Sequence, residues 1–132
     1  MYLLDSDILI YSLKGNSAVQ KQLVLHLNDA LKVSVISMME LYYGAFKSER
    51  TAGNLAKVRK IERHLEVLPV SIEIAETIGM LKSDMESRGT RLDDFDLIIA
   101  SSALAHNLIL VTNNICHFER IEGLKIENWT KE

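Results

Sequence analysis

Tyr2-Leu3-Leu4-Asp5-Ser6-Asp7 opens the 132-residue chain with three apolar side chains followed by two carboxylates. A short apolar run of this kind, closed by polar residues, is typical of a buried β-strand. Ligands of open parallel sheets bind beyond the carboxyl ends of the strands, where strand meets helix. The opening stretch therefore predicts a first strand that ends at Asp5, a position where a functional site is expected.

Further apolar segments recur along the chain and alternate with helical patterns. We expect strands at residues 31–36, 67–70, 108–111 and 124–126. Apolar side chains at helical spacing predict helices at residues 8–13, from Ser17 onward, and at residues 38–47, 54–65, 72–87 and 94–106. Short strands that alternate with helices indicate an α/β fold, with a central parallel sheet flanked by helices on both faces.

The composition is that of an ordinary globular protein, with 48% hydrophobic and 25% charged residues. No apolar run approaches the ~20 residues of a membrane span, and the first residues lack the basic region of a signal peptide. The single cysteine, Cys116, excludes an internal disulfide and a multi-cysteine zinc site. With one proline, six glycines and no linker-like stretch, we expect one domain over residues 1–132 and a cytoplasmic location.

Polar side chains also stand at other junctions between predicted elements. Glu40 lies one turn into the helix after the second strand, Asp96 in the first turn of the apolar helix 94–106, and Asn114 just after the strand 108–111. If Asp5, Glu40 and Asp96 converge, their mutual repulsion requires a hard divalent cation with oxygen ligands, such as Mg²⁺ or Mn²⁺. Zinc is disfavoured because the four histidines show no HxxxH or HxH spacing.

Each of these acidic residues also has a purely structural interpretation. Asp5 or Asp7 would serve as the N-cap of the first helix, and Asp93 as that of the helix 94–106. Ser37-Met38-Met39-Glu40 has the pattern of a capping box, in which Glu40 binds a backbone N–H. Caps do not require carboxylates at three strand-to-helix junctions, so the metal site and the capping roles both stay open.

Four segments, in this order, resemble the PIN-domain family and within it the VapC-type toxins of toxin–antitoxin pairs. They are Leu4-Asp5-Ser6-Asp7-Ile8-Leu9-Ile10-Tyr11, Ile36-Ser37-Met38-Met39-Glu40-Leu41-Tyr42-Tyr43-Gly44, Asp93-Asp94-Phe95-Asp96-Leu97-Ile98-Ile99-Ala100 and Leu110-Val111-Thr112-Asn113-Asn114, the last followed by His117-Phe118-Glu119. The resemblance extends from Tyr2 to about Trp129. It implies a PIN fold and a Mg²⁺- or Mn²⁺-dependent endoribonuclease that hydrolyses RNA phosphodiester bonds.

The resemblance places the family's three acids at Asp5, Glu40 and Asp96, as catalytic residues that bind the metal. Asp7 stands where the family usually has Asn, and Asn114 stands where members often have a fourth Asp. The Asn114 amide is still able to hold a water or a phosphate oxygen, so Asn114 counts among the expected catalytic residues. The fourth position stays open between Asn114, His117, Asp93 and Asp94.

The resemblance also implies partners. These are a cognate VapB-like antitoxin that covers the metal site, a second copy of the chain in a homodimer, and a higher hetero-oligomer formed with the antitoxin. No membrane partner is expected. The RNA substrate is expected to contact basic residues.

Basic residues are concentrated in one segment of this chain of net charge −3. Residues 47–63 hold six basic and two acidic side chains, a local charge of +4. We expect Arg59 and Lys60 on the polar face of the helix 54–65 to contact phosphates, with Arg88 and Arg91 as competing contacts. An ordinary solvated helix face is the alternative.

Two other functions fit part of the pattern. Leu4-Asp5-Ser6-Asp7 matches a haloacid-dehalogenase-type phosphatase, with Asp5 as nucleophile and Asp7 as acid and base. Against it, Ile8-Leu9 follows where a threonine is expected, no lysine motif is evident, and the chain is short. The second alternative is a non-catalytic PIN-like interaction or regulatory module, which the missing fourth acid keeps open.

Overall fold

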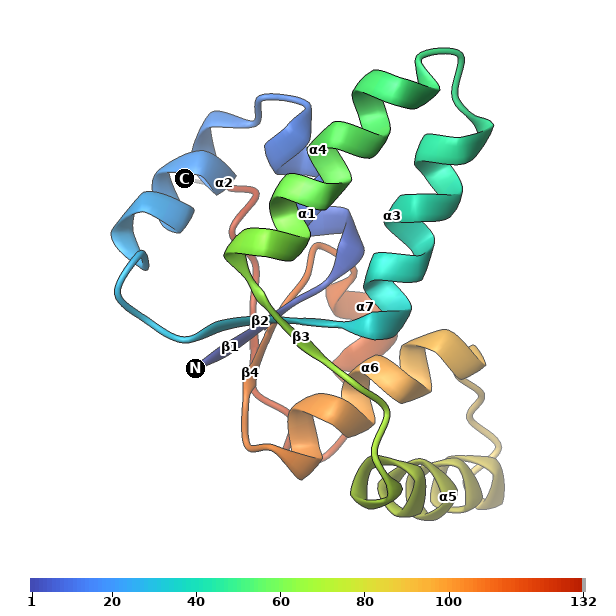
Figure 1. Ribbon diagram of the computed structural model, residues 1–132. Helices are drawn as coiled ribbons and strands as arrows, with labels where there is room; N and C mark the ends of the chain where they lie inside the picture. The colour runs from blue at the N-terminus through green and yellow to red at the C-terminus, as the bar shows by residue number, and fades with distance from the viewer. Residues whose placement is uncertain (132) are drawn as a thin grey trace.

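Five parallel strands form one sheet in the order β3-β2-β1-β4-β5, with helices on both faces (Figure 1). The computed structural model describes residues 1–131, so Glu132 of the expected domain lies outside the described residues. The strands are β1 (Tyr2–Leu4), β2 (Leu31–Ser34), β3 (Glu66–Leu68), β4 (Ile109–Val111) and β5 (Ile126–Glu127). The helices are α1 (Ser6–Leu13), α2 (Ser17–Leu25), α3 (Val35–Lys47), α4 (Thr51–His64), α5 (Ile72–Ser87), α6 (Asp94–Ala105) and α7 (Ile115–Phe118). The predicted α/β fold with a parallel sheet is confirmed.

Strand β1 lies at the centre of the sheet because both of its faces are apolar. Its alternate side chains belong to two hydrophobic cores, Leu3 to one and Leu4 to the other, and both are fully buried. In β4, likewise, Leu110 belongs to the first core and Val111 to the second. Helices α5, α6 and α7 cover the first core, and α1 to α4 cover the second (Figure 1).

The order in which strands are added to the sheet reverses between β1 and β4. The chain passes from β1 to β2 and β3 through α1 to α4 on one face, and then returns to β4 through α5 and α6 on the other. In such sheets a crevice forms at the carboxyl ends of the strands where the strand order reverses. Here that position is occupied by Asp5, directly after β1, and by Thr112, directly after β4.

Several predicted boundaries differ from the structure. The strand 31–36 ends at Ser34, because the Ser34 hydroxyl accepts the N–H of Ile36 at 3.1 Å and starts α3 two residues before Ser37. The helix predicted from residue 54 begins at Thr51. The strand predicted at residues 124–126 is displaced to Ile126–Glu127, and the one at 67–70 to Glu66–Leu68, before Pro69. The short helix α7 was not predicted.

None of the described helices is long and apolar enough to cross a membrane.

Candidate active site

Asp5 is held in place from three directions at the end of β1. Its N–H donates to the carbonyl of Val111 at 2.9 Å, which joins the ends of β1 and β4. Its Oδ1 accepts the N–H of Ser6 at 2.8 Å, and its Oδ2 accepts the Thr112 hydroxyl at 2.9 Å. Asp5 is therefore the N-cap of α1, as the structural interpretation expected, and also a buried carboxylate of the crevice.

The charge on Asp5 is disfavoured in this position. Burial, followed by the negative charge of Asp7, raises the pKa of Asp5 to about 7, although the hydrogen bonds from Thr112 and Ser6 lower it. A buried carboxyl group whose pKa is raised in this way is common at functional sites.

Asp7 lies beside Asp5 and was not among the residues assigned to the site from the sequence. Its Oδ2 accepts the N–H of Asn113 at 2.9 Å and lies 3.4 Å from the Thr112 hydroxyl. Its Oδ1 is buried and has no hydrogen-bond partner within residues 1–131. Burial raises the pKa of Asp7, against the effect of these hydrogen bonds. The carboxylates at positions 5 and 7 were the signal in the sequence, because both follow the first strand.

Glu40 of α3 lies beside the start of α1. The Ser6 hydroxyl donates to Glu40 Oε1 at 3.4 Å, across 34 positions of sequence. The capping-box interpretation of Glu40 is wrong, because Ser34 caps α3 and Ser37 lies inside the helix. Burial raises the pKa of Glu40, and the charges of Asp96, Asp93 and Asp7 raise it further.

Asp96 comes from the first turn of α6, on the opposite face of the sheet from α3. His117 Nδ1 of α7 lies 3.2 Å from Asp96 Oδ2. Burial raises the pKa of Asp96, whereas the hydrogen bond and charge of His117 lower it. The structure thus brings Asp5, Glu40 and Asp96 into one electrostatic neighbourhood, together with Asp7.

The loop after β4 is bonded to the residues that follow β1 and to α1. The N–H of Asn114 donates to the Thr112 hydroxyl at 3.0 Å, and the Asn114 residue itself is exposed. Asn113 is tied to the rest of the fold, because its amide N–H donates to the Tyr11 hydroxyl at 3.3 Å and its Oδ1 accepts from Asn128 and Thr130 at 3.1 Å. These contacts fix the loop that supplies donors to Asp5 and Asp7.

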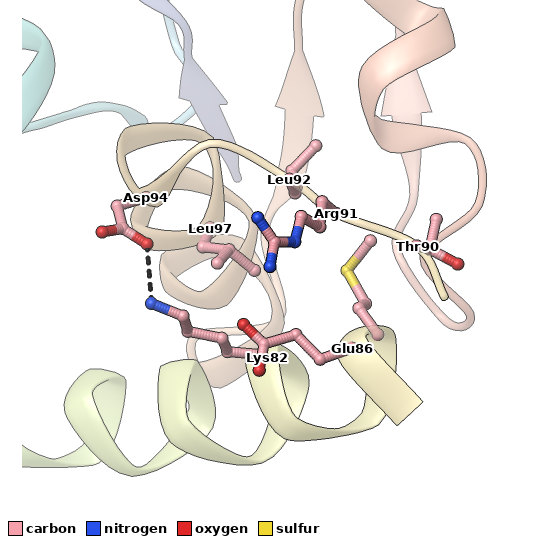
Figure 2. Close-up of a pocket in the computed structure, with 8 residues that line it drawn as sticks. Lys82, Glu86, Thr90, Arg91, Leu92, Asp94 and Leu97 are labelled. Atoms are coloured by element: carbon pink, nitrogen blue, oxygen red, sulfur yellow. Dashed lines mark hydrogen bonds and ion pairs between the residues drawn. The ribbon is translucent and has the colours of Figure 1, made fainter. Parts of the chain in front are cut away.

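Asp93 and Asp94, the other candidates for the fourth position, are both exposed. Asp93 is the N-cap residue of α6, but its side chain makes no capping hydrogen bond. Asp94 pairs with Lys82 at 3.1 Å (Figure 2).

The donor set fits a hard divalent cation. All four clustered side chains offer carboxylate oxygens, their pKa values are all raised, and one buried oxygen has no donor. Over residues 1–131, no three His, Cys, Asp or Glu side chains stand close enough to enclose an ion by themselves. This open arrangement is compatible with Mg²⁺, which is usually bound through one or two carboxylates while waters and substrate phosphates complete its shell.

The four basic residues expected to bind RNA lie on different parts of the surface. Arg59 of α4 lies close to Tyr42, whose hydroxyl donates to Glu62 at 2.6 Å. Lys60 is exposed on the same helix. Arg88 pairs with Asp84 at the end of α5.

Arg91 lines a small polar pocket of about 190 Å³ between α5 and the start of α6. In the view of Figure 2 its guanidinium group lies above the Glu86 carboxylate, while Lys82 lies beside Asp94.

A groove of about 380 Å³ lies between α1, α3 and α4, and Glu40 is one of the residues that line it. Lys14 and Lys57 line it. Lys57 belongs to the basic segment noted in the sequence, but Lys14 was not identified there. These lysines, rather than Arg59, share a groove with a residue of the acidic cluster.

Comparison with known proteins agrees with this geometry. The PIN domain family matches residues 2–124. Ribonuclease VapC2 of Rickettsia felis is 35% identical over 133 residues, 99% of this chain and 99% of the relative. The tRNA(fMet)-specific endonuclease VapC of Shigella flexneri is 32% identical over 129 residues, 98% of each chain.

A solved structure gives the same result for the fold. The crystal structure of VapBC2 from Rickettsia felis bound to a promoter DNA fragment contains a chain that matches with a TM-score of 0.91 and 35% identity, over 97% of this chain and 98% of that one. The chain therefore belongs to the PIN-domain family, and the two relatives that match it over almost their whole length are named as a VapC ribonuclease and a VapC endonuclease. The family match favours the PIN interpretation over the phosphatase interpretation of Asp5 and Asp7.

Proposed function

We propose that the chain is a metal-dependent endoribonuclease, the toxin of a type II toxin–antitoxin pair, and that Asp5, Glu40 and Asp96 hold its Mg²⁺ or Mn²⁺. The observation that carries the proposal is that Asp5, Glu40 and Asp96, from elements far apart in the sequence, lie near one another. Ser6 donates to both Asp5 and Glu40, and the charge of Asp96 raises the pKa of both. The ribonuclease names of relatives that match over almost the whole chain support the same reaction.

A divalent cation bound there supplies Lewis-acid chemistry, since it lowers the pKa of a water and stabilises negative charge on the phosphoryl oxygens. Neighbouring residues hold the carboxylates that would bind the cation. The Thr112 hydroxyl and the Ser6 N–H hold the two oxygens of Asp5, and the Ser6 hydroxyl holds Glu40. Asn114, which is exposed in the loop after β4, is proposed to bind a phosphate oxygen of the substrate through its amide.

RNA binding is proposed to use basic side chains around the crevice. Lys14 and Lys57 have the strongest support because they line the groove that Glu40 also lines. Arg59, Lys60, Arg88 and Arg91 are proposed as outer phosphate contacts, in keeping with their exposed positions. Because two relatives are named tRNA(fMet)-specific endonucleases, initiator tRNA is the first RNA to test.

The proposed partners follow from the complexes in which relatives have been solved. A VapB-type antitoxin is proposed to cover the crevice, since the matching Rickettsia felis structure is a VapBC complex. We also propose a homodimer that assembles further with the antitoxin, and a cytoplasmic location where RNA is available.

The test combines substitution with metal removal. Asp5→Asn and Asp96→Asn should each lower RNA cleavage by at least about a hundredfold, because one charged ligand is lost from the centre while the shape of the side chain is kept. Their circular dichroism spectra should match that of the unchanged protein. Excess EDTA should abolish cleavage, and added Mg²⁺ or Mn²⁺ should restore it.

Asp94→Asn is the matched control, because Asp94 is an exposed carboxylate that pairs with Lys82. Its cleavage rate should be unchanged. Full activity of the Asp5 or Asp96 variant, or cleavage that persists in EDTA, would refute the metal-dependent reaction. A folded unchanged protein that cleaves no RNA would favour the non-catalytic module.

A further inference from the structure

The carboxylate of Asp7 is only half engaged by the protein. Its Oδ2 accepts the N–H of Asn113 at 2.9 Å, whereas its Oδ1 is buried and has no hydrogen-bond partner among residues 1–131. A buried carboxylate oxygen without a donor is costly, and native structures rarely keep one without a functional reason. The free oxygen of Asp7 therefore calls for a ligand other than the protein's own donors.

The position of Asp7 indicates which ligand this is. The Thr112 hydroxyl lies 2.9 Å from Asp5 Oδ2 and 3.4 Å from Asp7 Oδ2, so the two carboxylates are neighbours. The charge of Asp7 adds to burial in raising the pKa of Asp5 and of Glu40, and the charge of Asp96 acts on Asp7 in the same way. Asp7 thus lies within electrostatic range of all three proposed metal ligands.

We propose that Asp7 supplies the fourth carboxylate of the cation centre, with its free Oδ1 directed to the ion or to the water that surrounds it. The proposal rests on the proposed function, because it assigns a further ligand to the same centre. It gives the fourth position to a residue two places after Asp5 rather than to the loop after β4.

The other candidates for this position are less suitable in the structure. Asn114 is exposed and carries no charge. Asp94 is 72% exposed at its side chain and is neutralised by Lys82 at 3.1 Å. His117 lies 3.2 Å from Asp96 Oδ2 and acts on that ligand rather than adding a negative charge.

The proposal predicts two effects of opposite sign for Asp7→Asn. Asparagine keeps the shape of the side chain and an oxygen acceptor for the N–H of Asn113, but removes the charge. Without metal, the variant should melt at a higher temperature than the unchanged protein, because the repulsion among buried carboxylates is reduced. With metal, it should bind the cation more weakly. A residue whose role is only to hold the loop would instead lower the melting temperature when changed.

The experiment measures Mn²⁺ binding to the full-length chain by calorimetry after removal of metal with EDTA, together with thermal melts with and without Mn²⁺. Asp7→Asn should weaken Mn²⁺ binding by about tenfold or more, a loss in the range seen when groups that support a metal site are removed. Asp94→Asn removes the same charge outside the cluster and should bind Mn²⁺ as the unchanged protein does. Asp5→Asn should abolish binding.

The outcomes separate the two proposals. Unchanged Mn²⁺ affinity in the Asp7 variant, with binding lost in the Asp5 variant, overturns the role of Asp7 and leaves the metal centre intact. Mn²⁺ binding that is unaffected by Asp5→Asn overturns the proposed metal centre itself. A lower melting temperature of metal-free Asp7→Asn, or an equal loss of affinity in Asp94→Asn, also overturns the role of Asp7.

Discussion

Thr112 shows how much of the site depends on a single hydroxyl. Its Oγ1 lies within hydrogen-bond distance of both Asp5 and Asp7, and it accepts the N–H of Asn114 at 3.0 Å. Thr112 is fully buried at the end of β4, so its position is set by the sheet and not by solvent. The hydroxyl therefore connects the two carboxylates after β1 to the loop after β4.

The raised pKa of Asp5 predicts how the stability of the metal-free protein depends on pH. In the unfolded chain Asp5 loses its proton near its ordinary pKa of about 3.9. In the folded protein burial and Asp7 raise that pKa to about 7. Between these values the unfolded state binds fewer protons than the folded state, so the free energy of unfolding falls as pH rises.

We expect the metal-free protein to lose about 1–3 kcal/mol of stability between pH 5 and pH 8. Urea unfolding at a series of pH values in EDTA measures this loss. Asp5→Asn should flatten the dependence, although Asp7, Glu40 and Asp96 will leave a smaller slope because their pKa values are also raised. A stability that rises over this range would contradict the assignment.

At the scale of the element, the start of α3 determines where Glu40 lies. Ser34 is the last residue of β2 and also the N-cap of α3, so strand and helix join without a loop. Had the helix begun at Ser37, Glu40 would lie in its first turn and bind backbone N–H groups. With the helix begun at Val35, Glu40 lies further along α3 and its carboxylate reaches Ser6 of α1.

The two serines distinguish these possibilities by experiment. Ser34→Ala should destabilise the protein by about 1 kcal/mol, because the cap of α3 is lost. Ser37→Ala should change the stability by no more than about 0.5 kcal/mol, or increase it, because the buried Ser37 hydroxyl has no hydrogen-bond partner within residues 1–131. Thermal or urea unfolding of both variants provides the comparison. A larger loss of stability in Ser37→Ala than in Ser34→Ala would indicate that Ser37, and not Ser34, caps α3.

At the scale of the whole molecule, the small net charge of −3 conceals an acidic region and a basic region that lie apart. Asp5, Asp7, Glu40 and Asp96 lie near the carboxyl end of β1, whereas a group of basic side chains lies on α4 and along the groove that Glu40 also lines. A nuclease needs this separation, because the acidic centre binds a cation while the surrounding surface attracts a polyanion.

This arrangement predicts different effects for two neighbouring residues of α4. Lys57→Glu should weaken RNA binding several-fold and reduce the slope of log affinity against log salt by about 1, because Lys57 lines the groove. Arg59→Glu should have a smaller effect, because Arg59 lies beside Tyr42 and Glu62. Binding is measured in an Asp96→Asn background, where cleavage is blocked. A larger effect at Arg59 would indicate that RNA binds on the other side of α4 and not along the groove.

Much of the fold could be predicted from local patterns. The helix 72–87 was predicted with the bounds that α5 has, and β1 was also predicted in full, because apolar spacing and polar ends are local properties of the chain. The boundary at Ser34 was missed because Val35 and Ile36 have β-branched side chains that favour a strand, and a hydroxyl cap outweighed that preference. The strand β5 was displaced because a two-residue edge strand has almost no pattern of its own.

Local patterns were enough to predict which residues follow the strands and to make Asp5, Glu40 and Asp96 candidates for one site, because polar residues at the ends of apolar segments mark the same edge of a parallel sheet. Contacts between elements were needed to show that Asp5 and Asp7 share the Thr112 hydroxyl, that Glu40 is not a cap, and that Lys57 rather than Arg59 lines the groove. These facts depend on contacts between elements up to 107 positions apart, which no local pattern records.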